Sequence, residues 1–242
     1  TLQYMPQCIT DYFGDGSALG VRLVYFTEDE PRGTAGSVKQ CMEFLGEEDF
    51  LVISGDAVCD LDLKAAMAFH STRRSAATLL LYRHPKPLEY GLVLTGQDGR
   101  IQQFIEKPGW GQVLTNMVNT GIYLLTRRAM DLVPEDRPFD FARDLFPALL
   151  YKGDELYGFS PKGYWCDMGD CSAYLECIAD ALSGKVRLDF GIPQAAPGIW
   201  CAGPIPQGIQ LLPPCYLGPG AEVGEGSLIG PYAVLGRGST VG

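Results

Sequence analysis

The sequence predicts an α/β fold followed by a short parallel β-helix. Apolar runs typical of strands alternate with helical patterns through the first 184 residues, which argues for a mainly parallel sheet with helices on its faces. A six-residue repeat then fills residues 208–242, and a repeat of this length indicates a parallel β-helix. One acidic stretch, DFLVISGDAVCDLD at 49–62, offers a candidate functional group, since it brings a carboxylate to the end of a strand.

That stretch begins with an apolar run, residues 50–53, which reads as a short buried strand. Gly55 has no Cβ, so backbone or ligand can approach it closely. Asp56 then stands at the carboxyl end of the strand, where open α/β sheets bind ligands. Asp60 or Asp62 is expected to cap a helix near 63–73. An ordinary turn with a solvated carboxylate is the alternative for this motif alone.

A glycine-rich segment follows the first expected strand, residues 21–26. Gly33-Thr34-Ala35-Gly36 leads into a helix with an apolar face. A strand, a glycine loop and a helix start together aim free backbone N–H groups at whatever lies before the helix, which suits a phosphate or a base. A tight strand-to-helix turn is the alternative.

Beyond Asp62 the alternation continues, with strands expected at 77–82, 91–95, 100–105, 116–125 and 156–160, and helices at 63–73, 126–133, 139–150 (capped by Asp140) and 172–182. Residues 91–105 form a hairpin around Gly96–Gly99, and Glu106-Lys107-Pro108 ends it. Asn119 offers the donors and acceptors that sugar hydroxyls require, although it also fits an ordinary turn. Asp167 is a second candidate ligand, and with Asp56 it could share one hard cation with phosphate oxygens.

The C-terminal repeat is strict. Aliphatic residues recur every six positions, and a glycine follows each one. Three such hexads make one coil, with the aliphatic side chain inside. We therefore expect a domain at 1–184, a Pro- and Gly-rich linker at 185–207 and an incomplete β-helix at 208–242. So short a β-helix needs to stack on something else, which makes a homo-oligomer contact plausible.

Composition excludes several classes of function. The 242 residues are 46% hydrophobic and 20% charged, with a net charge of −10, and they contain no basic block that would bind nucleic acid. No apolar run approaches the ~20 residues of a membrane span. Eight cysteines without a C-x-x-C pair indicate free, buried thiols in a reducing cytoplasm. With two histidines, a Ser-His-Asp triad is not expected.

Taken in order, these motifs resemble those of the sugar-1-phosphate nucleotidylyltransferases, most closely the mannose-1-phosphate guanylyltransferase branch. The resemblance covers nearly the whole chain and rests on G-T-A-G at 33–36, S-G-D at 54–56, Y-G at 90–91, E-K-P at 106–108, N-T-G at 119–121 and Y-W-C-D-M-G at 164–169. It implies a Rossmann-like mixed sheet with helices on both faces, followed by a short left-handed parallel β-helix.

The resemblance also implies a reaction. A nucleoside triphosphate and a sugar 1-phosphate give a nucleotide sugar, GDP-mannose in this branch, and pyrophosphate, and the enzyme's task is positioning and charge neutralisation. Asp56 and Asp167 match the family's Mg²⁺ ligands, and Lys107 matches a lysine near the sugar phosphate.

The substrate contacts follow from the same resemblance. Glu106 and Asn119 match residues that bond the sugar hydroxyls, and Gly91 lets the sugar lie close to the backbone. Gly33, Thr34, Ala35 and Gly36 match the segment beside the base. The matched motifs also place Gly55, Thr120 and Trp165 among the substrate-binding residues.

One departure from the family pattern stands out. Family members begin with a strand, a glycine-rich loop carrying an arginine, and a Pro-Lys-Pro segment, and this sequence shows none of them. For the chain as given, we therefore expect poor or no catalysis. A glucose-1-phosphate thymidylyl- or uridylyltransferase and a non-catalytic regulatory subunit that binds nucleotide sugars remain alternatives.

Overall fold

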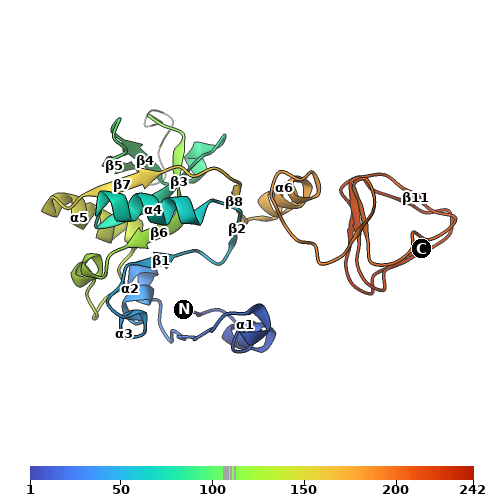
Figure 1. Ribbon diagram of the computed structural model, residues 1–242, viewed down its shortest axis with the longest axis horizontal. Coiled ribbons are helices and arrows are strands. Elements are labelled where there is room, and N and C mark those ends of the chain that lie inside the picture. The colour runs from blue at the N-terminus through green and yellow to red at the C-terminus, as the bar shows by residue number, and fades with distance from the viewer. Residues whose placement is uncertain (106–108, 110, 112) are drawn as a thin grey trace. The chain divides into compact units, whose positions relative to one another are not determined.

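The computed structural model describes residues 1–105, 109, 111 and 113–242 (Figure 1). The chain forms two compact units, each built from two stretches. The first unit contains Thr1–Ser54 and Leu63–Pro161, and the second contains Gly55–Asp62 and Lys162–Gly242. Asp56 and Asp167 therefore belong to the same unit, although they lie far apart in the sequence.

A mixed sheet forms the centre of the first unit. Its strand order is β5-β4-β6-β3-β7, and β1 also pairs with β6. Among the strand pairs that the structure describes in this sheet, β3–β7 is parallel and the others are antiparallel. The expectation of a mainly parallel sheet was therefore wrong, because the strand at 116–125 runs against its neighbours. The strands are β1 (Phe50–Val52), β3 (Ala77–Arg83), β4 (Leu92–Thr95), β5 (Ile101–Ile105), β6 (Met117–Leu125) and β7 (Leu156–Phe159).

Helices pack on both faces of this sheet. Leu79 of β3 belongs to a core that also contains Met42 and Phe146, whereas the hydroxyl of its neighbour Thr78 bonds His70 of α4. Successive strand residues therefore point to opposite, helix-covered faces. The helices of the unit are α1 (Pro6–Phe13), η1 (Ser17–Leu19), α2 (Gly33–Lys39), α3 (Met42–Leu45), α4 (Leu63–Arg73), η2 (Pro87–Glu89), η4 (Arg127–Leu132), η5 (Phe141–Leu145) and α5 (Phe146–Lys152).

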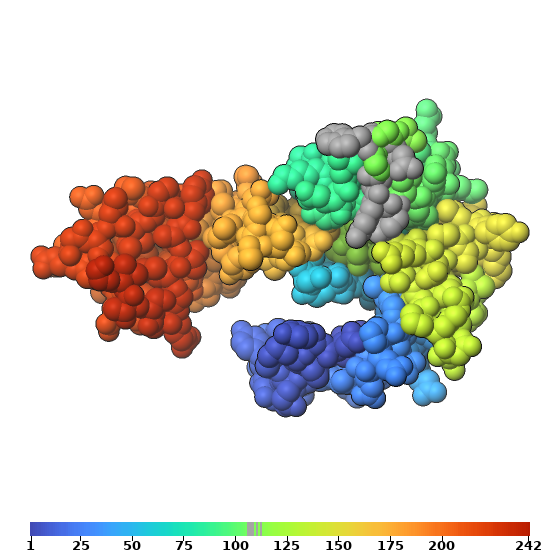
Figure 2. Space-filling view, turned by 180° about the vertical axis from the view of Figure 1, so that it is seen from behind, coloured from blue at the N-terminus to red at the C-terminus, as the bar shows by residue number. Residues whose placement is uncertain are grey.

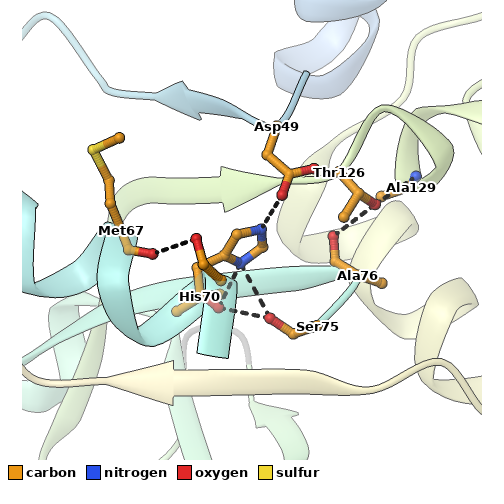
Figure 3. Close-up of polar contacts among 9 residues, drawn as sticks. Asp49, Met67, His70, Ser75, Ala76, Thr126 and Ala129 are labelled. Atoms are coloured by element: carbon orange, nitrogen blue, oxygen red, sulfur yellow. Dashed lines mark hydrogen bonds and ion pairs between the residues drawn. The ribbon is translucent and has the colours of Figure 1, made fainter. Parts of the chain in front are cut away.

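A buried polar cluster joins α4 to the sheet (Figure 3). His70 is 3% exposed, and its Nδ1 lies 2.8 Å from Thr78 Oγ1 and 3.1 Å from Ser75 Oγ. Its Nε2 lies 3.4 Å from the Asp49 carboxylate. The order Asp, His, Ser resembles a hydrolytic triad. Because Ser75 is 1% exposed, no substrate can reach it, so the cluster serves the fold.

The expected first strand, residues 21–26, is not a strand. Val21 and Leu23 donate their N–H groups to the loop carbonyls of Gly16 and Asp15, and Phe26 accepts one bond from Leu2. These scattered bonds form no ladder with a neighbouring strand. An apolar run with β-branched residues thus indicates a propensity for strand structure, but a strand forms only where a pairing partner is present.

The second unit begins with a short antiparallel ladder, β2 (Ala57–Cys59) with β8 (Trp165–Asp167). Helix α6 (Cys171–Leu182) follows, and the Asp170 carboxylate accepts a bond from Ala173 N at 2.8 Å. Tyr164, Cys177 and Val186 form a small buried core behind this ladder.

Residues of the six-residue repeat pair in parallel with residues 18 positions further along the chain. Gln210 pairs with Leu228, Tyr216 with Val234, and Glu222 with Thr240. The repeat residues form one continuous body (red in Figure 2). The strands of the repeat are β11 (Gln210–Leu211), β12 (Cys215–Leu217), β13 (Glu222–Val223), β14 (Leu228–Ile229), β15 (Val234–Leu235) and β16 (Thr240–Val241). They are preceded by β9 (Gln194–Ala196) and β10 (Ile199–Cys201).

The stretch expected to be a linker, 185–207, contains structure of its own. β9 and β10 lie within it, and β10 pairs in parallel with β12. Ile199 and Cys201 are buried with Cys215 and Leu217 in one core. Proline and glycine richness therefore marks tight corners between short strands here, not a flexible connection.

Two further sequence expectations concern the environment of the chain. Among the residues that the structure describes, none of the helices has the length and apolar character needed to cross a bilayer. All eight cysteines are free thiols, but Cys8 and Cys171 are exposed, so the expectation of buried thiols was wrong for these two.

Candidate active site

Two carboxylates meet at one end of the β2–β8 ladder. Asp167, the last residue of β8, pairs with Ala57, which directly follows Asp56 and Gly55. Met168 N lies 3.4 Å from Asp56 O, so the backbones stay together beyond the last ladder pair. The ladder thus brings together the two predicted metal ligands from distant parts of the sequence.

The electrostatics of this pair suit a cation. Burial raises the pKa of the Asp167 carboxyl above its ordinary value, and the negative charges of Asp56 and Asp170 raise it further. A bound cation would relieve this repulsion. Among the described residues, no group of three or more Asp, Glu, His or Cys side chains could hold a metal ion. A metal at Asp56 and Asp167 would therefore need further oxygen ligands, such as phosphates or water.

Trp165 lies on β8 opposite Cys59, two residues before Asp167. Its side chain is 4% exposed, so it contributes to the packing of the second unit. A substrate contact from this residue would involve only a small part of the indole ring.

The G-T-A-G segment forms the start of α2, but its amides are already used. Ala35 N and Gly36 N donate to Phe139 O at 2.9 and 3.0 Å, and Thr34 N donates to Asp140 Oδ1 at 3.2 Å. The expectation that these amides are free for a phosphate or base was therefore wrong. Gly33 has a φ of +71°, and a Cβ there would lie 2.7 Å from the Phe139 backbone. The glycine is needed because the two segments pack so closely.

Asp140 also departs from its expected role as a helix cap. Its Oδ1 accepts bonds from the N–H and the hydroxyl of Thr34, and its side chain makes no capping bond to the helix that it precedes. Only the backbone of Asp140 bonds this helix, since its carbonyl accepts from Asp144 N and Leu145 N and its N–H donates to Asp144 Oδ2. The Thr34 hydroxyl in turn accepts a bond from Phe141 N at 3.0 Å. Local sequence signals could not reveal this, because the partner lies 106 residues away.

The N-T-G motif creates a bulge in β6. Leu79 pairs with Tyr123 and Leu81 with Asn119, and Gly121 adopts a φ of +76° between them. Asn119 N donates to Gly91 O at 2.9 Å, so the structure brings these two predicted sugar-site residues together. Bulges commonly redirect side chains next to binding sites.

The side chains of this motif have internal partners. Asn119 Nδ2 donates to the Tyr123 hydroxyl at 3.0 Å, and its Oδ1 accepts from Gly121 N at 3.2 Å. Each amide atom retains capacity for one more bond. Thr120 is 3% exposed, and its hydroxyl donates to Leu80 O, so it stabilises the bulge. Glu106 and Lys107 lie outside the described residues.

A cavity of about 710 Å³ lies in the first unit beside α2, lined by residues that include Gly36, Lys39 and Gln40 and, from the segment after β6, Arg127 and Arg137. Its wall carries both positive and negative side chains. Neither Asn119 nor Gly91 lines it, so it is distinct from the bulge of β6.

Comparison with protein families decides the assignment of the chain. The family described as nucleotidyl transferase matches residues 1–184. The chain belongs to the nucleotidyl transferase family. This match covers all of the first unit and, in the second unit, the β2–β8 ladder with both carboxylates.

Individual relatives of this family member agree. It is 33% identical to a mannose-1-phosphate guanylyltransferase from Mycobacterium tuberculosis, over 99% of this chain and 62% of that protein. It is 30% identical to a UTP–glucose-1-phosphate uridylyltransferase from Synechocystis, over 99% of this chain and 68% of that protein. The crystal structure of HddC from Yersinia pseudotuberculosis complexed with GMP-PN superposes with a TM-score of 0.61 at 26% identity, covering 72% of this chain and 74% of that one.

The length of the match is also informative. The chain spans 62% of the Mycobacterium relative and 54% of a guanylyltransferase catalytic subunit from Drosophila pseudoobscura pseudoobscura. The activity, substrates and partners of the whole protein are therefore proposed below.

Proposed function

We propose that the protein containing this chain transfers a nucleotidyl group from a nucleoside triphosphate to a sugar 1-phosphate, giving a nucleotide sugar and pyrophosphate. The observation that carries this proposal is the β2–β8 ladder, in which Asp167 pairs with Ala57, the residue directly after Asp56, in a chain that belongs to the nucleotidyl transferase family.

The two carboxylates fit a Mg²⁺ ion, because paired oxygen ligands that repel each other when ionised are the donors that this hard cation prefers. Bound there, Mg²⁺ would neutralise phosphate charge. The remaining work belongs to the chain: it holds the two phosphate-bearing substrates so that the sugar phosphate oxygen is in line with the α-phosphorus. No covalent enzyme intermediate is involved.

Sugar recognition is assigned to the bulge of β6. Asn119 retains one donor and one acceptor for sugar hydroxyls, and its N–H donates to Gly91 O. Gly91 has no side chain, so a sugar ring would be able to lie close to the backbone there. Glu106 and Lys107 complete this proposal from the sequence resemblance alone. Lys107 would balance charge on the sugar phosphate.

Base recognition is assigned to the G-T-A-G segment. Since amides of this segment already bond residues 139–140, the base would contact other surface atoms of the segment. Guanine and mannose are supported by the Mycobacterium and Drosophila relatives, whose names state this activity. Uracil and glucose are the second candidate, supported by the Synechocystis relative.

The test is pyrophosphate release with Mg²⁺ by the full-length protein, with GTP, UTP, dTTP and ATP each offered against mannose and glucose 1-phosphates. We expect the highest kcat/KM for GTP with mannose 1-phosphate. If UTP with glucose 1-phosphate is the best pair, the result supports the second candidate function. Binding of nucleotide sugars without any turnover would identify a regulatory subunit and contradict the proposal.

We further infer that β10–β16 form the faces of a left-handed parallel β-helix, because these strands pair in parallel and the partners within the repeat lie 18 residues apart. The domain boundaries then become 1–184 for the transferase part and about 199 onward for the β-helix, with the former linker contributing β10 as its first strand. We also propose that this β-helix stacks in a homo-oligomer. A cytoplasmic location is proposed as well, because it suits eight free thiols.

A further inference from the structure

The β2–β8 ladder is short for the role that it has. It has three residue pairs, and the one at its end, Ala57 with Asp167, brings Asp56 near Asp167. An isolated two-stranded ladder is only marginally stable in water. The distance between the two carboxylates therefore depends on the contacts that stabilise the other end of the ladder.

Asp60 occupies that other end. Its Oδ1 accepts Tyr164 N at 2.6 Å, and its own N–H donates to Tyr164 O at 3.1 Å. The side chain of Asp60 thus accepts the bond that its backbone carbonyl would accept in a continued ladder, from Tyr164, the residue directly before β8. Gly163 permits this approach, since a Cβ at that position would lie 2.8 Å from Asp60 Oδ1.

The second carboxylate oxygen of Asp60 bonds a third segment. Oδ2 accepts Arg187 N at 2.9 Å and Arg187 Nε at 3.1 Å. Arg187 follows α6 and lies beyond residue 184, where the family match ends. Because its side chain is 83% exposed whereas that of Asp60 is 12% exposed, the ion pair alone contributes little, and the two backbone N–H bonds are the main contribution.

The pKa of the Asp60 carboxyl agrees with this geometry. Burial raises it, but the bonds from Arg187 N and Tyr164 N together with the Arg187 guanidinium outweigh that effect and leave the pKa below its ordinary value. The carboxylate is therefore held in its ionised, doubly accepting form.

We propose that Asp60 is a positioning residue that holds the β2–β8 ladder in register and so sets the distance between Asp56 and Asp167. Arg187, in the segment that leads to the β-helix, is bonded to the same carboxylate. The proposal rests on the proposed function, in which those two side chains hold a divalent cation.

The test measures Mn²⁺ affinity and backbone hydrogen exchange in this chain for Asp60→Asn, Arg187→Ala and the wild type. Asparagine keeps one acceptor oxygen, so it can bond Tyr164 N or Arg187 N but not both. We expect Asp60→Asn to weaken Mn²⁺ binding about 10-fold or more, the range typical of residues that orient metal ligands, and to speed exchange at residues 57–59 and 165–167. Arg187→Ala keeps its backbone donor and should change both quantities only a few-fold.

Asp189→Asn is the matched control. It removes the same charge two residues after Arg187, from a carboxylate that bonds Gly191 N at 2.8 Å, and should leave both measurements at wild-type values. Unchanged exchange and affinity in Asp60→Asn would overturn the proposal. If Asp60→Asn does not fold, a 10-fold loss of affinity in Arg187→Ala without faster ladder exchange would also overturn it. Absence of Mn²⁺ binding by the wild type, with ladder exchange still faster in Asp60→Asn, would contradict the metal assignment and leave the role in the ladder supported.

Discussion

Gly33 shows how a single residue can be required for a close approach between segments. A Cβ there would lie 2.7 Å from the backbone of Phe139, and the φ of +71° is also unfavourable for other residues. Gly46 has nearly the same φ, +73°, with nothing within 4 Å.

We predict that Gly46→Ala costs about 1–3 kcal/mol of unfolding free energy, the cost of a sparsely populated backbone conformation with positive φ, and that Gly33→Ala costs clearly more because the clash is added. Urea unfolding of both variants measures the difference. Equal losses would contradict the packing of α2 against residues 139–140.

At Asp167 the repulsion between neighbouring carboxylates is expected to lower the stability of the fold. Its carboxylate is partly buried and faces the charge of Asp56, so neutralising it should relieve repulsion in the metal-free chain. We predict that Asp167→Asn raises the melting temperature by about 1–3 °C at pH 7 without added metal, whereas Asp189→Asn does not. A lower melting temperature for Asp167→Asn would argue that the carboxylate stabilises the fold.

Among the elements, α4 is joined to β3 by a buried hydrogen bond between His70 and Thr78. Burial lowers the pKa of this imidazole below 6.5, and the nearby Asp49 offsets only part of that effect. The unfolded chain therefore takes up the proton at higher pH than the folded chain does. Stability should be fully present above about pH 6.5 and decline as the pH falls below it.

We predict that His70→Gln flattens this decline between pH 7.5 and 5, as measured by urea unfolding at each pH. His84→Gln is the control, because His84 is the other histidine of the chain and bonds Lys86 N in a loop. An identical decline in wild type and His70→Gln would assign the pH dependence to other groups.

The repeat makes a second prediction at this scale. Leu217 is 1% exposed within the core of β10 and β12, whereas Val234 of β15 is 45% exposed. We predict that Leu217→Ala costs about 2–5 kcal/mol and that Val234→Ala costs less than about 1 kcal/mol. Similar costs at both positions would contradict an inward aliphatic residue in each hexad.

Over the whole molecule, periodicity predicted most of the elements but not their partners. The strands at 77–82 and 116–125 and the helices at 63–73 and 172–182 occur within one or two residues of their expected ends. The direction of β6 and the unpaired segment 21–26 could not be predicted, because strand pairing depends on contacts between distant residues.

The same limit applies to the candidate site. Asp56 and Asp167 were identified because each follows a strand beside a glycine or within a family motif. Asp140, and either Asp60 or Asp62, were expected to be helix caps, since a capping signal depends only on the next three residues. The carboxylates of Asp60 and Asp140 accept bonds from Tyr164 and Thr34, which lie 104 and 106 residues away.

The most direct test of the account is Mg²⁺-dependent pyrophosphate release by the full-length protein carrying Asp56→Asn or Asp167→Asn, with Asp189→Asn as the control. The account predicts that each of the first two variants loses at least about 100-fold in kcat/KM, or about 2.7 kcal/mol of transition-state stabilisation, while the control retains wild-type activity. Wild-type turnover in both Asp56→Asn and Asp167→Asn would contradict the central claim that these two carboxylates form the catalytic metal site.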